Sequence, residues 1–224
     1  CMELLGADFH DPNNLEVTLS LKNILDIPIL VIFDVCHLIK LLRNSYGDLQ
    51  EFISEGKTIS WKYVILLHEL QSKNGLHLAN RLRNQHVNYK ENKMKTSLAC
   101  QTFSKAVSNS INYLRLQNYR EFKDSEETSY FINLVNDMFD HLNSKSKFGK
   151  YLKGPLSAKN FDIWTKNFDK YTDYILNMTH IDGTPVVGGK RKAAFLGFIV
   201  AMKRFRRATF NILNSLQHNF EICF

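Results

Sequence analysis

Apolar residues recur at spacings of three and four along most of this chain, as in helices that bury one face. The pattern covers residues 61–70, 92–118, 129–143, 158–178 and about 190–217, and shorter runs follow it near residues 2–6 and 38–44. Charged, Gly-containing or Pro-containing stretches separate these segments. We therefore expect about seven helices, one or two strands and a mainly α fold.

The clearest strand pattern is the apolar run 27–33, IPILVIF, which should be buried on both faces. It ends at Asp34, and a helix pattern begins in LIKLLRN. Asp34 with His37 fits a metal-binding pair, but an Asp directly before a helix is more often its N-cap. We favour the cap, with His37 packed against the helix.

Segment 92–118 has no Gly or Pro, which predicts one continuous amphipathic helix. Its apolar side carries Met94, Leu98, Ala106, Ile111 and Leu114, with Thr102 as a weak member. Beside that side runs a strip of small hydroxyl residues: Thr96, Ser97, Ser104, Ser108 and Ser110. Such a strip lets a helix approach either another helix or a polar ligand, and both alternatives stay open.

Segment 129–143 is predicted to bury Phe131, Leu134, Val135, Met138 and Leu142. Asp140 and Asn143 lie three residues apart, on one side of this helix. They form either a helix end with its cap or a pair of polar groups that meets one ligand.

Composition indicates a folded protein, because the 224 residues include 16 Phe and 9 Tyr. The net charge of +7 suits a polyanionic partner. Seven cations fall within the last predicted helix and its start: Lys190, Arg191, Lys192, Lys203, Arg204, Arg206 and Arg207. We expect them to bind DNA phosphates, whereas the alternative is a solvated helix that keeps the protein soluble.

The four cysteines, Cys1, Cys36, Cys100 and Cys223, form no CxxC pair and have no matching His spacing. This pattern argues against a metal site and a disulfide framework, and for a reducing compartment. No apolar run is long enough to span a membrane, so we expect a soluble intracellular protein. Since the chain begins with Cys, we also expect a segment of a longer protein.

The stretch GTPVVGGKRK resembles a phosphate-binding loop, GxxxxGK[ST]. Gly189 displaces the lysine by one position, and Arg191 stands where Ser or Thr would bind Mg²⁺. No strong strand precedes it, so we reject this interpretation.

Three motifs in order, FDVCHLIKLLRN, KMKTSLACQTFSKAV and KRKAAFLGF, resemble the P-element-type transposase family, which includes the THAP-domain transposases. In that family an RNase H fold is split by a helical insertion that binds GTP. The resemblance covers nearly the whole chain, and Val35 replaces the usual Pro. It implies residues 1–37 as a partial RNase H-like segment with its strand at 27–33, residues 38–180 as the helical GTP-binding insertion, and residues 181–224 as a return segment with a basic helix.

The resemblance implies GTP as a cofactor that positions DNA and is not hydrolysed; whether Mg²⁺ accompanies it stays open. The implied nucleotide contacts fall on Ser104, Asp140 and Asn143, with Thr96 where relatives usually have Val. A basic contact from the preceding segment matches Arg81 most nearly. A carboxylate such as Asp140 can accept protons from both guanine N1–H and its amino group, which adenine does not offer in that geometry.

DNA cutting in this family needs three carboxylates with two metal ions. The motifs that supply them are not in this chain, and neither Asp34 nor Glu221 matches one, so no catalytic or metal residue is predicted. The alternatives are a segment of an active transposase whose carboxylates lie elsewhere, or a structural remnant without nucleotide binding. The resemblance also implies nuclear localisation and DNA as partner, and leaves homo-oligomerisation open.

Overall fold

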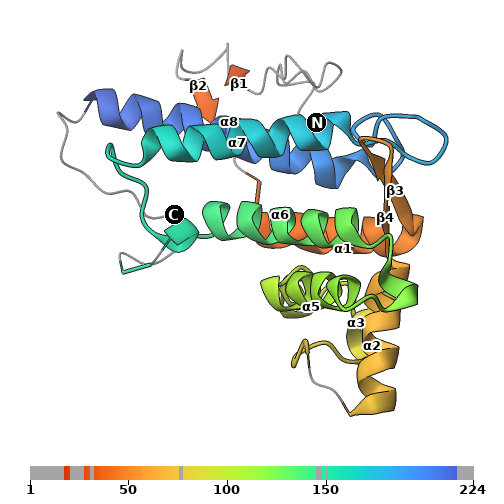
Figure 1. Cartoon of the computed structure of the whole chain (residues 1–224). Helices are drawn as coiled ribbons and strands as arrows, with labels where there is room; N and C mark the ends of the chain where they lie inside the picture. The colour runs from red at the N-terminus through yellow and green to blue at the C-terminus, as the bar shows by residue number, and fades with distance from the viewer. Residues whose placement is uncertain are drawn as a thin grey trace.

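The computed structural model describes residues 18–20, 28–30, 33–75, 78–144, 148–149 and 151–215; for 18–20, 28–30 and 212–215 only the backbone is described. Within these ranges the protein is mainly helical, as predicted (Figure 1). The helix pattern at residues 2–6 and Glu221 lie outside the described residues. No helix in the described ranges is long and apolar enough to cross a membrane.

The strands and helices follow in this order: β1 Thr18–Ser20, β2 Pro28–Leu30, α1 Val35–Leu49, β3 Glu51–Ser54, β4 Lys57–Ser60, α2 Lys62–Asn74, α3 Asn84–Val87, η2 Tyr89–Asn92, α4 Thr96–Thr102, α5 Lys105–Leu116, η3 Arg120–Phe122, α6 Glu126–Leu142, η4 Tyr151–Lys153, α7 Phe161–Asn177 and α8 Lys192–Ser215. The strand expected at 27–33 is represented by β2, which pairs antiparallel with β1 in the register Leu19↔Ile29. Asp34 caps α1 by accepting the Cys36 N–H at 2.9 Å, as favoured from the sequence. His37, however, is exposed and does not pack against the helix.

A second hairpin, β3–β4, was not predicted. Its turn residues Glu55 and Gly56 both have positive φ, 49° and 75°, as a two-residue turn of this kind requires. The hairpin buries Phe52 and Ile59 completely and pairs in the register Ser54↔Lys57. Thr179, just after α7, exchanges two backbone hydrogen bonds with Ile53 at 2.8 and 2.9 Å. The hairpin therefore joins the end of α7 to the rest of the fold.

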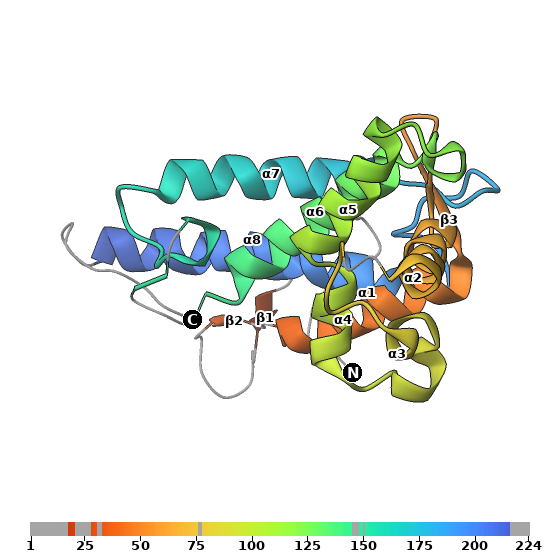
Figure 2. The same cartoon turned by 60° about the horizontal axis from the view of Figure 1, so that its bottom comes forward.

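The helices lie in three tiers in Figure 1, with α7 and α8 above, α1 and α6 in the middle, and α5 with α2 below. Figure 2 shows α4 and α3 beside α1 on its far side from α8. Helix α1 packs on both α4 and α8, and α6 packs on α5, α7 and β4. At the α1–α8 contact a Cβ on Gly197 would meet the Leu38 side chain, so the glycine allows the two helices to approach closely without moving that leucine.

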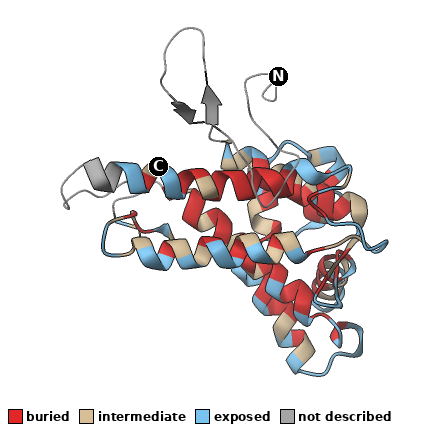
Figure 3. Cartoon of the chain, turned by 90° about the horizontal axis from the view of Figure 1, so that it is seen from above, coloured by how far each residue is buried: buried red, intermediate tan, exposed pale blue. Residues whose placement is uncertain are grey.

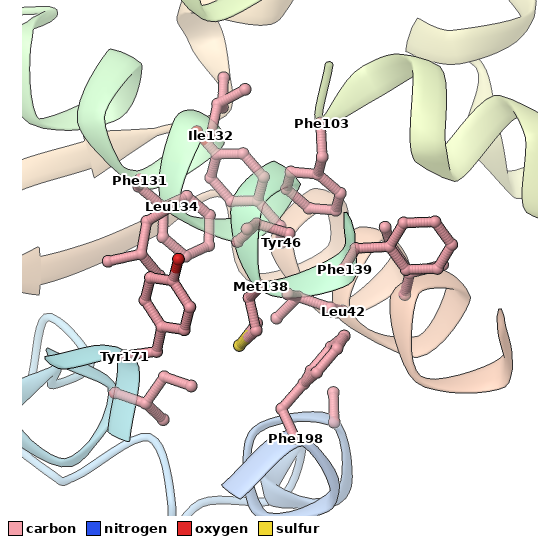
Figure 4. Packing of buried hydrophobic residues seen from close by; sticks show 14 of the residues in the cluster. Leu42, Tyr46, Phe103, Phe131, Ile132, Leu134, Met138, Phe139, Tyr171 and Phe198 are labelled. Atoms are coloured by element: carbon pink, nitrogen blue, oxygen red, sulfur yellow. The ribbon is translucent and has the colours of Figure 1, made fainter. Parts of the chain in front are cut away.

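The core is centred on the ring of Tyr46 in α1 (Figure 4). It stacks on Phe52 and Phe103 and meets Trp61 and Phe131 edge-on, with ring centroids 5.1 to 6.2 Å apart. Such aromatic pairs add to the free energy gained by burying their area. In Figure 3 the buried residues lie mainly where the helices face one another. Elements from α1 to α6 are thus held by one aromatic cluster.

The segment 92–118 is not one helix, contrary to our prediction. It forms α4 and α5, and the break falls at Phe103 and Ser104. Ser104 has extended backbone angles and its hydroxyl oxygen accepts the Val107 N–H at 3.4 Å, so it is the N-cap of α5. Met94 is 72% exposed, and Ala106 is also exposed, so neither belongs to an apolar core face.

Part of the hydroxyl strip forms a helix contact, which is one of the two alternatives that the sequence left open. Ser108 is buried, and its hydroxyl donates to the Ser129 carbonyl of α6 at 2.8 Å, while the Ser129 hydroxyl donates to the Ser108 carbonyl at 2.9 Å. These residues let α5 and α6 pack closely. Ser97 is exposed, and Thr96 and Ser104 are half-buried.

Helix α6 buries all five residues predicted for its core face, from Phe131 to Leu142. Helix α7 buries four of the five apolar residues that its spacing indicates, whereas Phe161 is half-buried; the four are Trp164, Phe168, Tyr171 and Ile175. Helix α2 ends at Gly75 in the left-handed conformation, which is a common way to end a helix.

Candidate functional site

Helix α6 carries a polar stripe opposite its core face, made of Asn133, Asn136, Asp137 and Asp140. These positions follow the i, i+3, i+4, i+7 spacing that places side chains on one helix face. Asn133 Nδ2 donates to Asp137 Oδ2 at 3.2 Å, and Asn136 Nδ2 donates to Asp140 Oδ2 at 3.2 Å. The two carboxylates are therefore held in fixed orientations along the helix.

Two lysines from other elements reach these carboxylates. Lys105 Nζ of α5 lies 3.1 Å from Asp137 Oδ1, and Lys153 Nζ of η4 lies 3.4 Å from Asp140 Oδ1. Both lysine side chains are more than half exposed, whereas both aspartate side chains are less than one-fifth exposed. The aspartates are fixed acceptors, and the lysines can leave them at small cost because such pairs contribute only about 0.2–1 kcal/mol.

The pKa of the Asp140 carboxyl is raised above its ordinary value because burial disfavours its charged form. Lys153, by charge and hydrogen bonding, and Asn136, by hydrogen bonding, act in the opposite direction, and Asp137 adds to the rise. Both oxygens of Asp140 thus have protein partners here, one of them a removable lysine.

Thr96 and Ser104 lie at the two ends of α4. The pKa of the Cys100 thiol of α4 is raised to about 11, mainly by burial and to a smaller extent by the charges of Cys36 and Asp140. Thr96 begins α4 one turn before Cys100. Ser104 directly precedes Lys105, which pairs with Asp137. The α4–α5 junction and the polar stripe of α6 therefore border the same region.

Asn143 is the C-cap of α6 and is half-buried, and its backbone N–H donates to Phe139 O at 2.9 Å. Arg81 is exposed on the turn before α3, and among the described interactions it has no hydrogen bond or ion pair with α6. Helix α3 instead joins α4 through His86 Nε2 and Gln101 Oε1 at 2.9 Å. Ser104 thus lies next to Lys105, which pairs with the polar stripe that carries Asp140, and Asn143 ends the same helix. Among the described interactions, neither Thr96 nor Arg81 has a hydrogen bond or ion pair with α6.

Lys105, Lys153 and Asp137 were missed from the sequence. The helical spacing of Asp137 to Asp140 was a usable signal, since both fall on one face. Lys153 follows a loop, so no periodicity could place it beside Asp140.

Behind the polar stripe, His141 is completely buried and anchors the last turns of α6 on α7. Its Nδ1 lies 3.1 Å from the Asp137 carbonyl and 3.2 Å from the Tyr171 hydroxyl, and its Nε2 lies 3.4 Å from Asn167 Nδ2. These partners fit the tautomer with its proton on Nδ1, which donates to the carbonyl while Nε2 accepts from Asn167. Burial lowers the pKa of His141 to about 4, so the ring is neutral near pH 7.

The cations expected to bind DNA do not form one continuous exposed face. Lys190 and Lys192 are exposed, Arg191 pairs with Asp48 of α1, and Arg206 pairs with Asp169 of α7 at 3.0 Å. Arg204 is only 4% exposed, contrary to the expectation of an exposed phosphate contact. Lys203 is half-buried and Arg207 is exposed. Helix α8 is buried from Ala194 to Met202 because it packs against α1 and α7, so its exposed cations are Lys192 at its start and Arg206 and Arg207 beyond the buried stretch.

Hollows of about 460, 510, 180 and 280 Å³ lie elsewhere on the described surface, and none of these four is lined by Asp140 or Ser104. Within the described ranges no group of three or more His, Cys, Asp or Glu residues is arranged to hold a metal ion. The region around Asp140 contains three kinds of polar group. Helix α6 carries a fixed pair of carboxylate acceptors, the start of α5 carries backbone N–H groups and Lys105, and Lys153 carries a movable ammonium.

A family model described as "TNP-like, GTP-binding insertion domain" matches residues 36–155. Five predicted nucleotide contacts lie within this range: Arg81, Thr96, Ser104, Asp140 and Asn143. The predicted DNA-binding cations, Lys190 to Arg207, lie beyond it.

Two curated proteins are similar to the chain over 168 residues, which is 75% of its length. The chain is 28% identical to "DNA transposase THAP9" of Homo sapiens and covers 18% of that protein. It is 29% identical to "Transposable element P transposase" of Drosophila melanogaster and covers 21% of it. The chain therefore spans about a fifth of the length of the curated relatives it matches.

The fold is similar to a chain in the solved "Drosophila P element transposase strand transfer complex", with a TM-score of 0.76. The similarity covers 96% of this chain and 47% of that chain, at 24% sequence identity. It supports the arrangement of the helices described above.

Proposed function

Because this chain belongs to the family of TNP-like, GTP-binding insertion domains, we propose that it is the nucleotide-binding part of a P-element-like transposase. In this proposal GTP is a positioning cofactor that is not hydrolysed, and the chain contacts DNA without cutting it alone. Residues 38–180 are the insertion, with residues 1–37 and 181–224 as flanking segments that join an RNase H-like part.

The observation that carries this proposal is the Asp140 carboxylate. It is less than one-fifth exposed, it borders the α4–α5 junction, and it lies in the range that matches the family. Guanine offers N1–H and an amino group side by side, and a carboxylate accepts from both. Adenine offers an acceptor where guanine has N1–H, so the same carboxylate would face a lone pair.

Guanine binding in this site requires Lys153 to leave Asp140 Oδ1. The separation of 3.4 Å and the exposure of the lysine make this exchange inexpensive, because water solvates the released ammonium. Asn136 keeps its hydrogen bond to Oδ2 and holds the carboxylate in place, and Oδ2 has a further lone pair for the ligand. The ion pair is replaced by two charge-assisted hydrogen bonds to the base.

The rest of the nucleotide lies toward the start of α5. Ser104 presents its hydroxyl there, and Lys105 is a half-exposed cation beside Asp137. The N–H groups of the first turn of α5 favour negative charge. We assign Ser104 to the ribose or phosphate, Thr96 to the pocket wall and Asn143 to the base edge, while Arg81 needs a movement of its turn to take part.

The alternative of a purely structural remnant is separated from this proposal by nucleotide binding. Calorimetric titration of the purified chain with GTP and ATP should give measurable binding of GTP and at least tenfold weaker binding of ATP. Ser104→Ala should weaken both nucleotides alike, since its contact does not involve the base. Equal affinity for the two nucleotides, or binding of neither, would leave the remnant interpretation.

A further inference from the structure

A small hollow of about 180 Å³ lies between α1 and the start of α8, apart from the nucleotide region. Lys93, Lys190 and Arg191 contribute three cations to its lining. Asn44, Ser45 and Asp48 of α1 supply the polar floor. Two basic stretches almost a hundred residues apart, KENKMK at 90–95 and KRK at 190–192, thus meet at one place.

The hollow has an excess of positive charge. Its one carboxylate, Asp48, pairs with Arg191 and also accepts the Tyr89 hydroxyl at 2.7 Å. Lys93 and Lys190 have no carboxylate within ion-pair distance in the described part of the chain. Two lysine charges therefore remain for an external anion, and Asn44 and Ser45 offer neutral donors between them.

The fold holds these cations in place before any ligand arrives. Arg43, which is completely buried, donates from Nη2 to the carbonyls of Asn92 and Lys93 at 3.0 and 3.2 Å and lies over the Tyr89 ring. Asn44 Nδ2 also reaches the Lys93 carbonyl, at 3.4 Å. On the other side, the pairing with Asp48 fixes Arg191 directly before α8.

Arg43 adds to the positive charge near the hollow. It has no ion pair with a carboxylate in the described part of the chain, and its Nη1 group is buried without a hydrogen-bond partner. A buried guanidinium beneath the 92–93 backbone raises the positive potential around Lys93. Since electrostatic interactions are screened less in a partly buried hollow, a phosphate there would gain more than one on an open surface.

We infer that this basic hollow, formed by Lys93, Lys190, Arg191, Asn44 and Ser45, binds a backbone phosphate of DNA. The inference rests on the proposed function in that DNA is the partner. A DNA strand fits better than a lone anion because exposed cations continue on both sides of the hollow, at Lys90, Lys95 and Lys192. The phosphate contacts expected from the sequence along α8 are thus moved to its beginning and joined there by the segment before α4.

The test measures DNA binding by the full chain at a series of salt concentrations. Fluorescence anisotropy of a labelled mixed-sequence duplex reports the binding. Replacing both Lys93 and Lys190 by Gln removes two phosphate contacts, so the slope of log affinity against log salt should become shallower by about 1.8. Affinity near physiological salt should fall about ten- to thirtyfold. The matched control, Lys159→Gln with Lys166→Gln, changes the net charge equally at two exposed positions and should change the slope little.

A variant that gains DNA affinity is also needed, because a loss of affinity alone could result from unfolding. Asp48→Asn removes the one negative charge in the hollow and keeps an acceptor for the Tyr89 hydroxyl, so DNA affinity should rise about threefold or more. Equal losses in the double variant and its control, or no gain with Asp48→Asn, would overturn the inference.

Parallel titrations with GTP distinguish the two sources of phosphate. The double variant should keep its GTP affinity; a loss for GTP with unchanged DNA binding would mean that the hollow holds the nucleotide's phosphates instead, which overturns the DNA assignment. If the wild type binds DNA and the double variant binds it equally well, only this inference fails. A wild type that binds no DNA would contradict the DNA part of the proposed function as well.

Discussion

Acid should lower the free energy of unfolding through His141, which is buried behind the polar stripe of α6. This ring is completely buried between α6 and α7, among Trp164, Phe168 and Tyr171, with ring centroids 4.8 to 5.8 Å away. Its pKa is lowered by burial to about 4 in the folded protein, against about 6.5 in an unfolded chain. Nearby, the Asp137 carbonyl and charge raise this pKa and the Lys105 charge lowers it, but burial is the largest cause.

The direction of this change in stability depends on whether the folded or the unfolded state binds the proton. Between pH 6.5 and 4 the unfolded chain is protonated at His141 and the folded protein is not, so acid favours unfolding. The stability associated with His141 is fully present above about pH 6.5 and is lost as pH falls toward 4. The loss amounts to about 1.4 kcal/mol at pH 5.5 and about 2.5 kcal/mol at pH 4.5, from 1.36 kcal/mol per pKa unit.

The assay is urea unfolding of the wild type and of His141→Gln between pH 7.5 and 4.5. Gln removes the titrating group and keeps an amide for Asn167 or Tyr171, so it lowers stability at every pH but should flatten the pH dependence. The quantity to compare is the change in unfolding free energy with pH, because other carboxylates titrate equally in both proteins. If the variant lost as much stability between pH 7.5 and 4.5 as the wild type, the buried neutral His141 would be refuted.

Two further predictions concern the α5–α6 contact and the Asp140 carboxylate. Ser108→Leu should lower the unfolding free energy by about 2–4 kcal/mol, because it removes a buried hydrogen bond and pushes α5 away from α6. Urea unfolding measures this change, and the control Asn109→Leu, at the exposed neighbouring position, should cost little. Equal losses in the two variants would contradict the close helix contact. Because the pKa of Asp140 is raised by burial, GTP affinity should fall on acidification at a pH above the ordinary Asp range near 3.9, while ATP binding follows only the titration of the phosphates. Lys153 lowers that pKa, so Lys153→Gln should move the fall to higher pH, and calorimetry that finds the same pH dependence for both nucleotides would remove Asp140 from base recognition.

The helices were largely predictable because their apolar spacing reflects burial directly. The core faces of α6 and α7 follow the pattern from Phe131 to Leu142 and from Trp164 to Ile175. The break at Ser104 was not predicted, because a serine inside a periodic stretch looks alike whether it faces solvent or caps a helix. Only the tertiary position of Phe103, buried beside Tyr46 and Phe131, makes the cap the better solution.

The hairpin β3–β4 was missed for a related reason. Each strand has four residues, too few for a clear alternation, and Ser54 and Ser60 are buried although they are polar. The turn residues Glu55 and Gly56 were the one local signal. Asp140 was proposed from the family resemblance, but its pairing with Lys153 depends on a distant segment that no spacing in the sequence connects. The same holds for the meeting of Lys93 with Arg191 at the basic hollow.

The most direct test of guanine recognition exchanges the hydrogen-bond pattern of both partners at Asp140. Xanthine has a carbonyl where guanine has its amino group, so Asp140→Asn can accept from N1–H and donate to that carbonyl. We expect Asp140→Asn to lose at least tenfold in affinity for GTP and to gain affinity for xanthosine triphosphate over the wild type, by calorimetric titration of both proteins with both nucleotides. A variant that binds GTP as tightly as the wild type, or that loses GTP without gaining xanthosine triphosphate, would contradict the assignment of Asp140 to the base.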